Sequence, residues 1–216
     1  MTTRHHVSDD LLVGYESGSL AEGWSLAVAT HLALCPECRW RARQAAAIGG
    51  AMFEEIEPVA VEVSSLDAVL ARIAIPETSW EPAAAAPDQA VIPGPLRHYV
   101  GGDVSRIPWR RLGMTARHLP IKTAYKETSV RLLCIRAGEP VPRHGHRGAE
   151  LTVVLTGALV DGSEVFRRGD VEEADETVEH QPAAGPGEDC ICLAVTDAPL
   201  RFKNLVARLV QPFLRI

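Results

Sequence analysis

Three residues near the start of the chain, His31, Cys35 and Cys38, have types and a spacing that can hold a metal ion. They lie in the segment HLALCPEC, and on a helix a histidine and a cysteine four positions apart share one face. The second cysteine, one turn further on, can converge on the same centre. Tetrahedral zinc takes four nitrogen or sulfur ligands, and three are present in this segment. We expect the fourth from the same domain, with His6 as the candidate and His5 as its alternative.

The Cys-x-x-Cys pair by itself has other interpretations. A redox pair of the thioredoxin type follows a strand in an α/β unit, and no such unit is visible in this sequence. A histidine at a helix end beside two buried thiols is the purely structural interpretation. The chain has five cysteines, an odd number that fits metal ligands or buried thiols better than a disulfide framework. A closed site with four protein ligands would make the zinc structural, which suits a small domain.

A second set of residues with metal-ligand character lies in GEPVPRHGHRGAELTVVLTG, residues 138–157. His144 and His146 are two positions apart, so on a strand they face the same side, and Glu150 keeps the same parity. Two histidines and a carboxylate that converge are typical of a site for a first-row transition metal. Zinc, iron, manganese, nickel and copper all remain open from these residues, and our expectation of zinc rests only on the family resemblance of the whole chain given below.

Helices must position the first set, and strands the second. We expect helices over 9–17 after Ser8, over 20–34 after Ser19, from Cys38 to about Glu57, and within 64–73. From residue 96 onward, short alternating runs such as ELTVVLTGAL and DCICLAVT predict a barrel or jelly roll. The predicted fold is a multidomain α plus all-β chain: a helical domain 1–75, a Pro/Ala-rich linker 76–95, a barrel 96–200 and a C-terminal extension 201–216.

Composition excludes several classes of protein. The chain has 216 residues, of which 28 are acidic and 22 are Lys or Arg, for a net charge of -6. Nucleic-acid binding needs a basic surface, so a zinc-finger DNA binder is disfavoured. No apolar run reaches the length of a membrane span, and the segment MTTRHHVSDDLL lacks the apolar core of a signal peptide. We therefore expect a cytoplasmic protein without direct contact to a membrane.

The first set of residues resembles the zinc-binding anti-sigma domain. The resemblance covers residues 1 to about 75 and rests on His6, a long helical gap, and H-x-x-x-C-x-x-C at His31, Cys35 and Cys38. In that family the helical domain holds an extracytoplasmic-function sigma factor and prevents it from joining RNA polymerase.

The second set matches the first cupin motif: G, five residues, H-x-H, three residues, E, six residues, G. The second cupin motif is recognisable by the separation of Gly169 and His180, although Asp175 and Thr177 replace its usual proline and glycine. The resemblance implies a double-stranded β-barrel. It also implies a metal held by the four residues His144, His146, Glu150 and His180.

A zinc anti-sigma domain followed by a cupin is the arrangement of the ChrR family of anti-sigma factors. This resemblance implies a negative regulator of transcription that binds a sigma factor of the RpoE type. It also implies that singlet oxygen or organic hydroperoxides trigger release through the cupin. Cys190 and Cys192 alternate on one strand, where they either sense oxidants or only pack in the core, which is the commoner case. The alternative function is a dioxygenase-like cupin metalloenzyme whose helical domain serves for docking.

Overall fold

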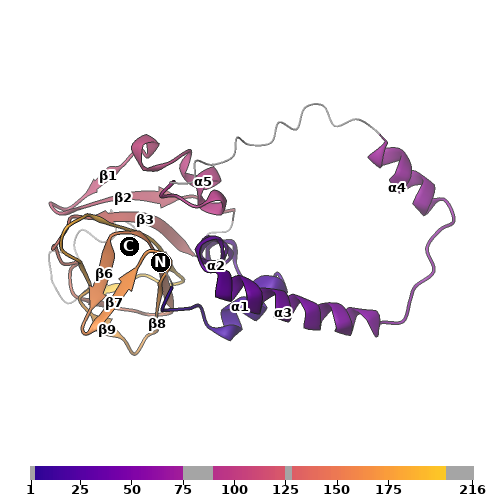
Figure 1. Cartoon of the computed structure of the whole chain (residues 1–216), viewed down its shortest axis with the longest axis horizontal. Helices are drawn as coiled ribbons and strands as arrows, with labels where there is room; N and C mark the ends of the chain where they lie inside the picture. The colour runs from indigo at the N-terminus through magenta and orange to yellow at the C-terminus, as the bar shows by residue number, and fades with distance from the viewer. Residues whose placement is uncertain (1–2, 75–89, 125–127, 203–216) are drawn as a thin grey trace.

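The structure is a computed structural model that describes residues 3–74, 90–124 and 128–202. Its helices precede its strands along the chain, as Figure 1 shows. The helical elements are α1 (Asp9–Glu16), α2 (Glu22–Leu34), α3 (Pro36–Glu54), α4 (Ser65–Ile73), α5 (Gly94–Val100) and the short 3-10 helix η1 (Val104–Arg106). Among the described residues, no helix combines the length and apolar character that a membrane crossing requires.

Two helix starts differ from the predictions. α2 begins at Glu22, not at residue 20, because the Ser19 hydroxyl donates to the Gly14 carbonyl at the end of α1 and does not cap α2. α3 begins at Pro36, not at Cys38, since proline fits the first turn of a helix, where its missing N–H is not needed. Cys35 is therefore the N-cap of α3, and its Sγ accepts from the Cys38 N–H at 3.4 Å.

Two further boundaries also move. α3 ends at Glu54 and not near Glu57. Glu57 directly precedes Pro58, and the residue before a proline is disfavoured in a helix. α5 begins at Gly94, inside the segment expected to be a linker, with Pro95 in its first turn. The rest of the predicted linker up to residue 89, and the extension beyond residue 202, lie outside the described residues.

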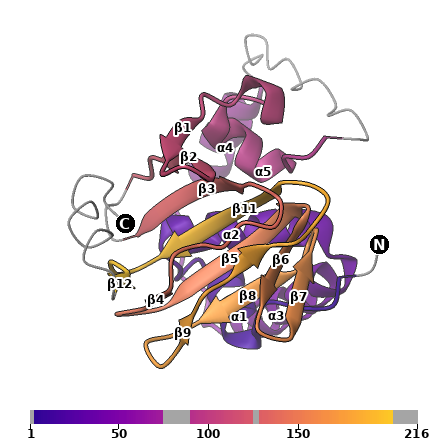
Figure 2. The ribbon, with the colours of Figure 1, turned by 90° about the vertical axis from the view of Figure 1, so that its left-hand side faces the viewer.

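The strands form three antiparallel sheets that enclose a barrel (Figure 2). One sheet has the order β1-β2-β3-β11-β5-β8, the second β10-β6-β7 and the third β12-β4-β9. Their bounds are β1 Arg110–Leu112, β2 Ala116–Ile121, β3 Ser129–Ile135, β4 His144–Gly145, β5 Glu150–Thr156, β6 Ala158–Asp161, β7 Glu164–Arg167, β8 Val171–Ala174, β9 Glu179–His180, β10 Ala183–Ala184, β11 Cys190–Thr196 and β12 Arg201–Phe202.

Strand register divides the six-stranded sheet into two different faces. Leu193 on β11 opposes Val153 on β5, and both belong to an apolar cluster that also contains residues of α2. Cys192, of opposite parity, belongs instead to a second cluster with Leu159 and Phe166 from the β10-β6-β7 sheet. One face of the large sheet therefore packs against helices, and the other lines the interior of the barrel.

α2 lies directly on the outer face of this sheet. Its residues Ala27 and Val28 are completely buried in the same cluster as Leu151 and Leu193. Gly23 permits the close approach, because a Cβ at this position would lie 2.7 Å from Val130 Cγ2 on β3. The helical region and the barrel consequently share one hydrophobic core.

Residues beyond the middle of α3, and all of α4, lie apart from this core. Figure 1 shows α3 projecting away from the barrel and α4 standing at a distance from it. No residue of α4 is buried. Large apolar side chains are exposed on both elements, among them Phe53 at 74% and Ile73 at 73%.

The shared core predicts that Leu193→Ala destabilises both parts of the molecule together. Leu193 is fully buried, and truncation of such a leucine costs about 2–5 kcal/mol of unfolding free energy. Denaturant unfolding should show one transition, shifted equally for helical circular dichroism and for the fluorescence of the tryptophans. Val165→Ala on β7, where the side chain is 36% exposed, is the control and should have a small effect. A helical signal that stays unshifted in Leu193→Ala would contradict a shared core.

Candidate metal centres

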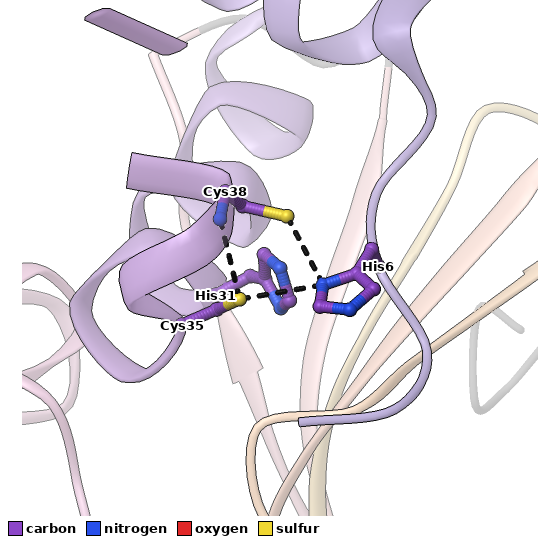
Figure 3. Close-up of side chains that lie close together, drawn as sticks. All are labelled: His6, His31, Cys35 and Cys38. Carbon is purple, nitrogen blue, oxygen red and sulfur yellow. Dashed lines mark hydrogen bonds between the residues drawn. The ribbon is translucent and has the colours of Figure 1, made fainter. Parts of the chain in front are cut away.

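Four side chains of the helical region form a compact group (Figure 3): His6, His31, Cys35 and Cys38. Their potential ligand atoms all lie within 4.8 Å of one another. His6 comes from the segment before α1, His31 from the last turn of α2, and the two cysteines from the start of α3. The Sγ atoms of Cys35 and Cys38 each lie 3.4 Å from His6 Nδ1.

The orientation of His31 fits a metal ligand. Its Nδ1 lies 2.7 Å from the carbonyl oxygen of Gly169, and since a carbonyl only accepts, Nδ1 carries the proton. Nε2 is then left with a free lone pair. That atom is buried, and the described residues offer it no hydrogen-bond partner. An unpaired buried imidazole nitrogen beside two thiols is a donor set that suits a transition metal such as zinc.

Burial also controls the protonation of this group. It lowers the pKa of His31 to about 4, and it raises the pKa of Cys38 to about 11, with help from the neighbouring Cys35. At neutral pH the imidazole is therefore neutral and the thiol protonated. A metal cation held here would displace thiol protons, so its binding is coupled to proton release.

The structure brings His6 into this group and places His5 elsewhere. The His5 ring packs on Phe166, with 4.5 Å between ring centroids, and its Nε2 lies 3.2 Å from the Glu164 carboxylate. His5 therefore faces the barrel. The alternation of direction along an extended segment explains why adjacent histidines face different neighbours.

A second group, His144, His146 and His180, lies in the barrel. His144 on β4 is paired with His180 on β9, and all three residues are at least 94% buried. His180 Nε2 lies 3.1 Å from the Nε2 atoms of both other residues. Three imidazole nitrogens thus converge on one point, a donor set that suits first-row transition metals.

The outer nitrogens of His144 and His180 face hydrogen-bond acceptors. His144 Nδ1 lies 2.9 Å from the Pro142 carbonyl oxygen, and His180 Nδ1 lies 2.8 Å from Asp161 Oδ2 and 3.4 Å from Glu172 Oε1. His146 Nδ1 lies 3.6 Å from Glu150 Oε2, beyond hydrogen-bond distance, and the described residues offer it no hydrogen-bond partner. The acceptors beside His144 and His180 are in positions that orient metal-binding histidines so that their other nitrogen faces the ion.

Glu150 occupies a different place from the three histidines. Its carboxylate lies on the outer side of His146 and accepts from the Thr152 hydroxyl at 3.1 Å. Burial, reinforced by the nearby Glu172, raises the pKa of Glu150 to about 7. The prediction that Glu150 binds the metal directly therefore stays a prediction.

Asp161 and Glu172 are residues of the barrel group that the sequence did not predict. Burial by itself would lower the pKa of His180, but the contacts with Glu172 and Asp161 outweigh it and raise the pKa to about 9. The available signal was the run VEEA, in which Glu172 is an acidic residue at an inward-facing position of a strand. This signal could be used only once the register between β5 and β8 was known. Glu172 is paired with Thr152, and this pairing shows which face of the sheet the Glu172 side chain occupies.

The five cysteines are all free and buried. Cys190 and Cys192 lie in the cluster that fills the barrel interior. The Cys190 thiol and burial raise the pKa of Cys192 well above its ordinary value. Burial also raises the pKa of Cys134.

A helical region with a two-histidine, two-cysteine group, packed on a β-barrel with a three-histidine group, defines a two-part protein with two candidate metal centres. Residues 98–199 match the family model described as the ChrR cupin-like domain. The whole chain is 50% identical over 216 residues to the anti-sigma-E factor ChrR of Cereibacter sphaeroides, with 100% of both chains covered. The chain belongs to the ChrR family of anti-sigma factors.

A solved structure agrees with this assignment. The chain is similar to one in the crystal structure of Rhodobacter sphaeroides SigE in complex with the anti-sigma ChrR, at 47% identity and a TM-score of 0.80. The match covers 91% of this chain and 100% of that one. The predicted fold class, a helical region followed by a cupin barrel, is confirmed.

The raised pKa values of Cys134 and Cys192 predict low thiol reactivity in the folded protein. Because alkylation requires the thiolate, a higher pKa means less reactive species at any pH below it. Iodoacetamide at pH 7 should label both residues slowly in the native protein and all five cysteines after denaturation with a chelator, as mass spectrometry can quantify. Rapid labelling of Cys192 in the native state would contradict this expectation and support the oxidant-sensing interpretation.

Proposed function

We propose that this protein is a cytoplasmic anti-sigma factor that binds an extracytoplasmic-function sigma factor of the RpoE type and blocks transcription. The helical region makes the contact, and the barrel receives the signal that releases the sigma factor, either singlet oxygen or an organic hydroperoxide. Membership of the ChrR family supports the class of function. The relative whose crystal structure is similar was solved in complex with SigE.

The exposed apolar faces of α3 and α4 carry this proposal. Along α4 the apolar residues recur at the helical spacing i, i+3, i+4 and i+7, and each side chain is at least half exposed: Leu66, Val69, Leu70 and Ile73. The end of α3 and the segment after it expose Ile48, Met52, Phe53 and Ile56. A helix with a one-sided apolar stripe on which none of the described residues pack suits a groove on a protein partner.

Charge supports a protein partner over a nucleic acid. Residues 1–75 contain ten acidic and five basic residues, with no lysine. Such a region can cover the basic surfaces that a sigma factor uses for polymerase or DNA, and it repels phosphates.

We assign zinc to His6, His31, Cys35 and Cys38, and zinc or another first-row transition metal to the barrel histidines. The helical group offers two sulfurs and two nitrogens, the set that closed structural zinc sites use. When bound, the ion would tie together the N-terminal segment, α2 and α3, and so hold the helices that present the contact surface. In the barrel group it would take the imidazole nitrogens that already face one another.

The alternative is a cupin enzyme, and we place it second. Two cavities, of about 520 and 560 Å³, are both lined by Arg117, Cys134 and Asp189, and neither includes the three-histidine group. Turnover of small diketone or phenolic substrates by iron-loaded protein would favour the enzyme.

The direct test is co-expression with the sigma factor, followed by size exclusion and metal analysis. We expect a one-to-one complex that carries two metal ions per chain of this protein. The double variant Leu66→Asp/Leu70→Asp should lose the complex, since each buried anchor of an interface contributes about 2 kcal/mol or more, at least about 30-fold in Kd.

The matched control adds the same charge to the opposite face of α4. In Ala68→Asp/Ala71→Asp both substitutions lie away from the apolar stripe, so the complex should persist. Metal content should equal that of the wild type in both double variants. Retention of the complex by Leu66→Asp/Leu70→Asp would contradict the role of this face.

The sensing role predicts a separation of binding from release. His144→Ala/His146→Ala removes two of the three barrel nitrogens, and the variant should still bind the sigma factor but should not release it on exposure to tert-butyl hydroperoxide. Fluorescence anisotropy of the labelled sigma factor measures both steps. His98→Ala, an exposed histidine on α5, is the control and should release normally. Normal release by the double variant would exclude the barrel group from sensing.

A further inference from the structure

The turn between β7 and β8 belongs to the barrel, yet it contacts the helical metal group. The backbone of this turn is anchored on β5, because the Gly169 N–H donates to the Val154 carbonyl at 2.8 Å and the Val154 N–H donates to the Asp170 carbonyl at 3.0 Å. Gly169 has φ +91°, a conformation that residues with side chains rarely adopt. A fixed turn of the barrel is thus presented to the helices.

Gly169 contacts the helical group through its carbonyl oxygen, which accepts from His31 Nδ1 at 2.7 Å. This bond selects the tautomer and the ring direction that leave His31 Nε2 facing the thiols. The absence of a side chain at Gly169 matters here, since a Cβ would lie 3.4 Å from Leu34 Cβ on α2 and 3.1 Å from Thr3 Oγ1.

Asp170 holds the segment that carries the other histidine. Its Oδ1 accepts from the backbone N–H groups of Arg4 at 2.6 Å and His5 at 3.1 Å, and its Oδ2 accepts from the Arg167 N–H at 2.7 Å. The Val171 N–H then donates to the His5 carbonyl at 3.2 Å. Asp170 is 97% buried, so these bonds are protected from water. They fix the backbone immediately before His6.

The same strand also reaches the barrel group. Glu172 Oε1, two residues after Asp170, lies 3.4 Å from His180 Nδ1. Its neighbour Glu173 points the other way, and its Oε1 accepts from the Ser8 N–H at 2.8 Å. Alternation along β8 therefore places contacts to one metal group on one side and contacts to the N-terminal segment on the other.

We propose that β8 and the turn before it couple the two metal centres, with Gly169 and Asp170 as positioning residues for His31 and His6 and with Glu172 as the link to His180. The helical metal group then depends on the barrel for its orientation, and a change at the barrel histidines alters the grip of the helical group on its ion. This inference rests on the metal-binding part of the proposed function and gives a route for the signal.

Cobalt(II) titration of the full chain tests the positioning role. Thiolate-to-cobalt absorption reports only the group with Cys35 and Cys38, since the barrel group offers histidines. Asp170→Ala should weaken cobalt binding at the helical group by about 10–100-fold in competition with a chelator, the range for loss of an outer hydrogen-bond partner. Asp170→Asn should lie between this variant and the wild type, because its Oδ1 still accepts from Arg4 and His5.

Asp103→Ala is the matched control. The Asp103 carboxylate likewise accepts two consecutive backbone N–H groups, from Val91 at 3.3 Å and Ile92 at 2.9 Å, but these lie in the segment before α5. Its removal should leave the cobalt affinity of the helical group unchanged. Thermal unfolding shows whether each variant folds, and if Asp170→Ala does not, Asp170→Asn decides the question.

The coupling is tested by measuring the same cobalt affinity with the barrel group intact and with His144→Ala/His146→Ala. We expect the two values to differ by at least about fivefold, and Glu172→Gln or Asp170→Ala to abolish the difference. Folded Asp170 variants with wild-type affinity, or equal affinities with and without the barrel histidines, would overturn the proposal. The cobalt affinity is measured without the sigma factor. A failure of the coupling is therefore distinguished from a failure of the proposed function, which is measured by binding of the sigma factor.

Discussion

The apolar contact between α2 and the outer face of the six-stranded sheet is the constraint on which the rest of the structure depends. It buries Ala27 and Val28 against Leu151 and Leu193, and Gly23 lets the helix approach β3. Because α2 also carries His31, the same contact sets the position of the helical metal group relative to the barrel. Hydrophobic burial determines how close the two parts lie, and hydrogen bonds then determine their alignment.

Both candidate metal centres follow one physical rule. In each, a histidine donates from its outer nitrogen to a fixed acceptor, and the inner nitrogen faces other potential ligands. For His31 the acceptor is the Gly169 carbonyl, and for His180 it is the Asp161 carboxylate. The two groups differ in their donors, with thiols only in the helical one. That difference suits a structural role for the helical group and leaves the barrel group open to exchange or chemistry.

The surface proposed for the partner is separate from both centres. The apolar stripe of α4 and the exposed end of α3 lie beyond the shared core, and contacts with the other described residues do not bury them. A change at the start of α3 can alter how the exposed apolar surface beyond its other end is presented to a partner. Cys35 is the N-cap of α3 and Cys38 lies in its first turn, so the candidate metal group is at the opposite end of α3 from the exposed apolar residues.

The sequence by itself predicted the histidines and cysteines of the two candidate metal groups, the division into a helical region and a barrel, and the family. These features depend on local spacing: i, i+4 on a helix for His31 and Cys35, and i, i+2 on a strand for His144 and His146. The helix boundaries were harder to predict. The Ser19 hydroxyl donates to the Gly14 carbonyl and does not cap α2, and Pro36 occupies the first turn of α3, ahead of the predicted start at Cys38. Only the tertiary structure decided which carboxylates face the barrel histidines and that Gly169 and Asp170 hold the helical group. The contacts of Gly169 and Asp170 join residues more than a hundred positions apart, and no local periodicity records which distant strand will lie beside a given helix.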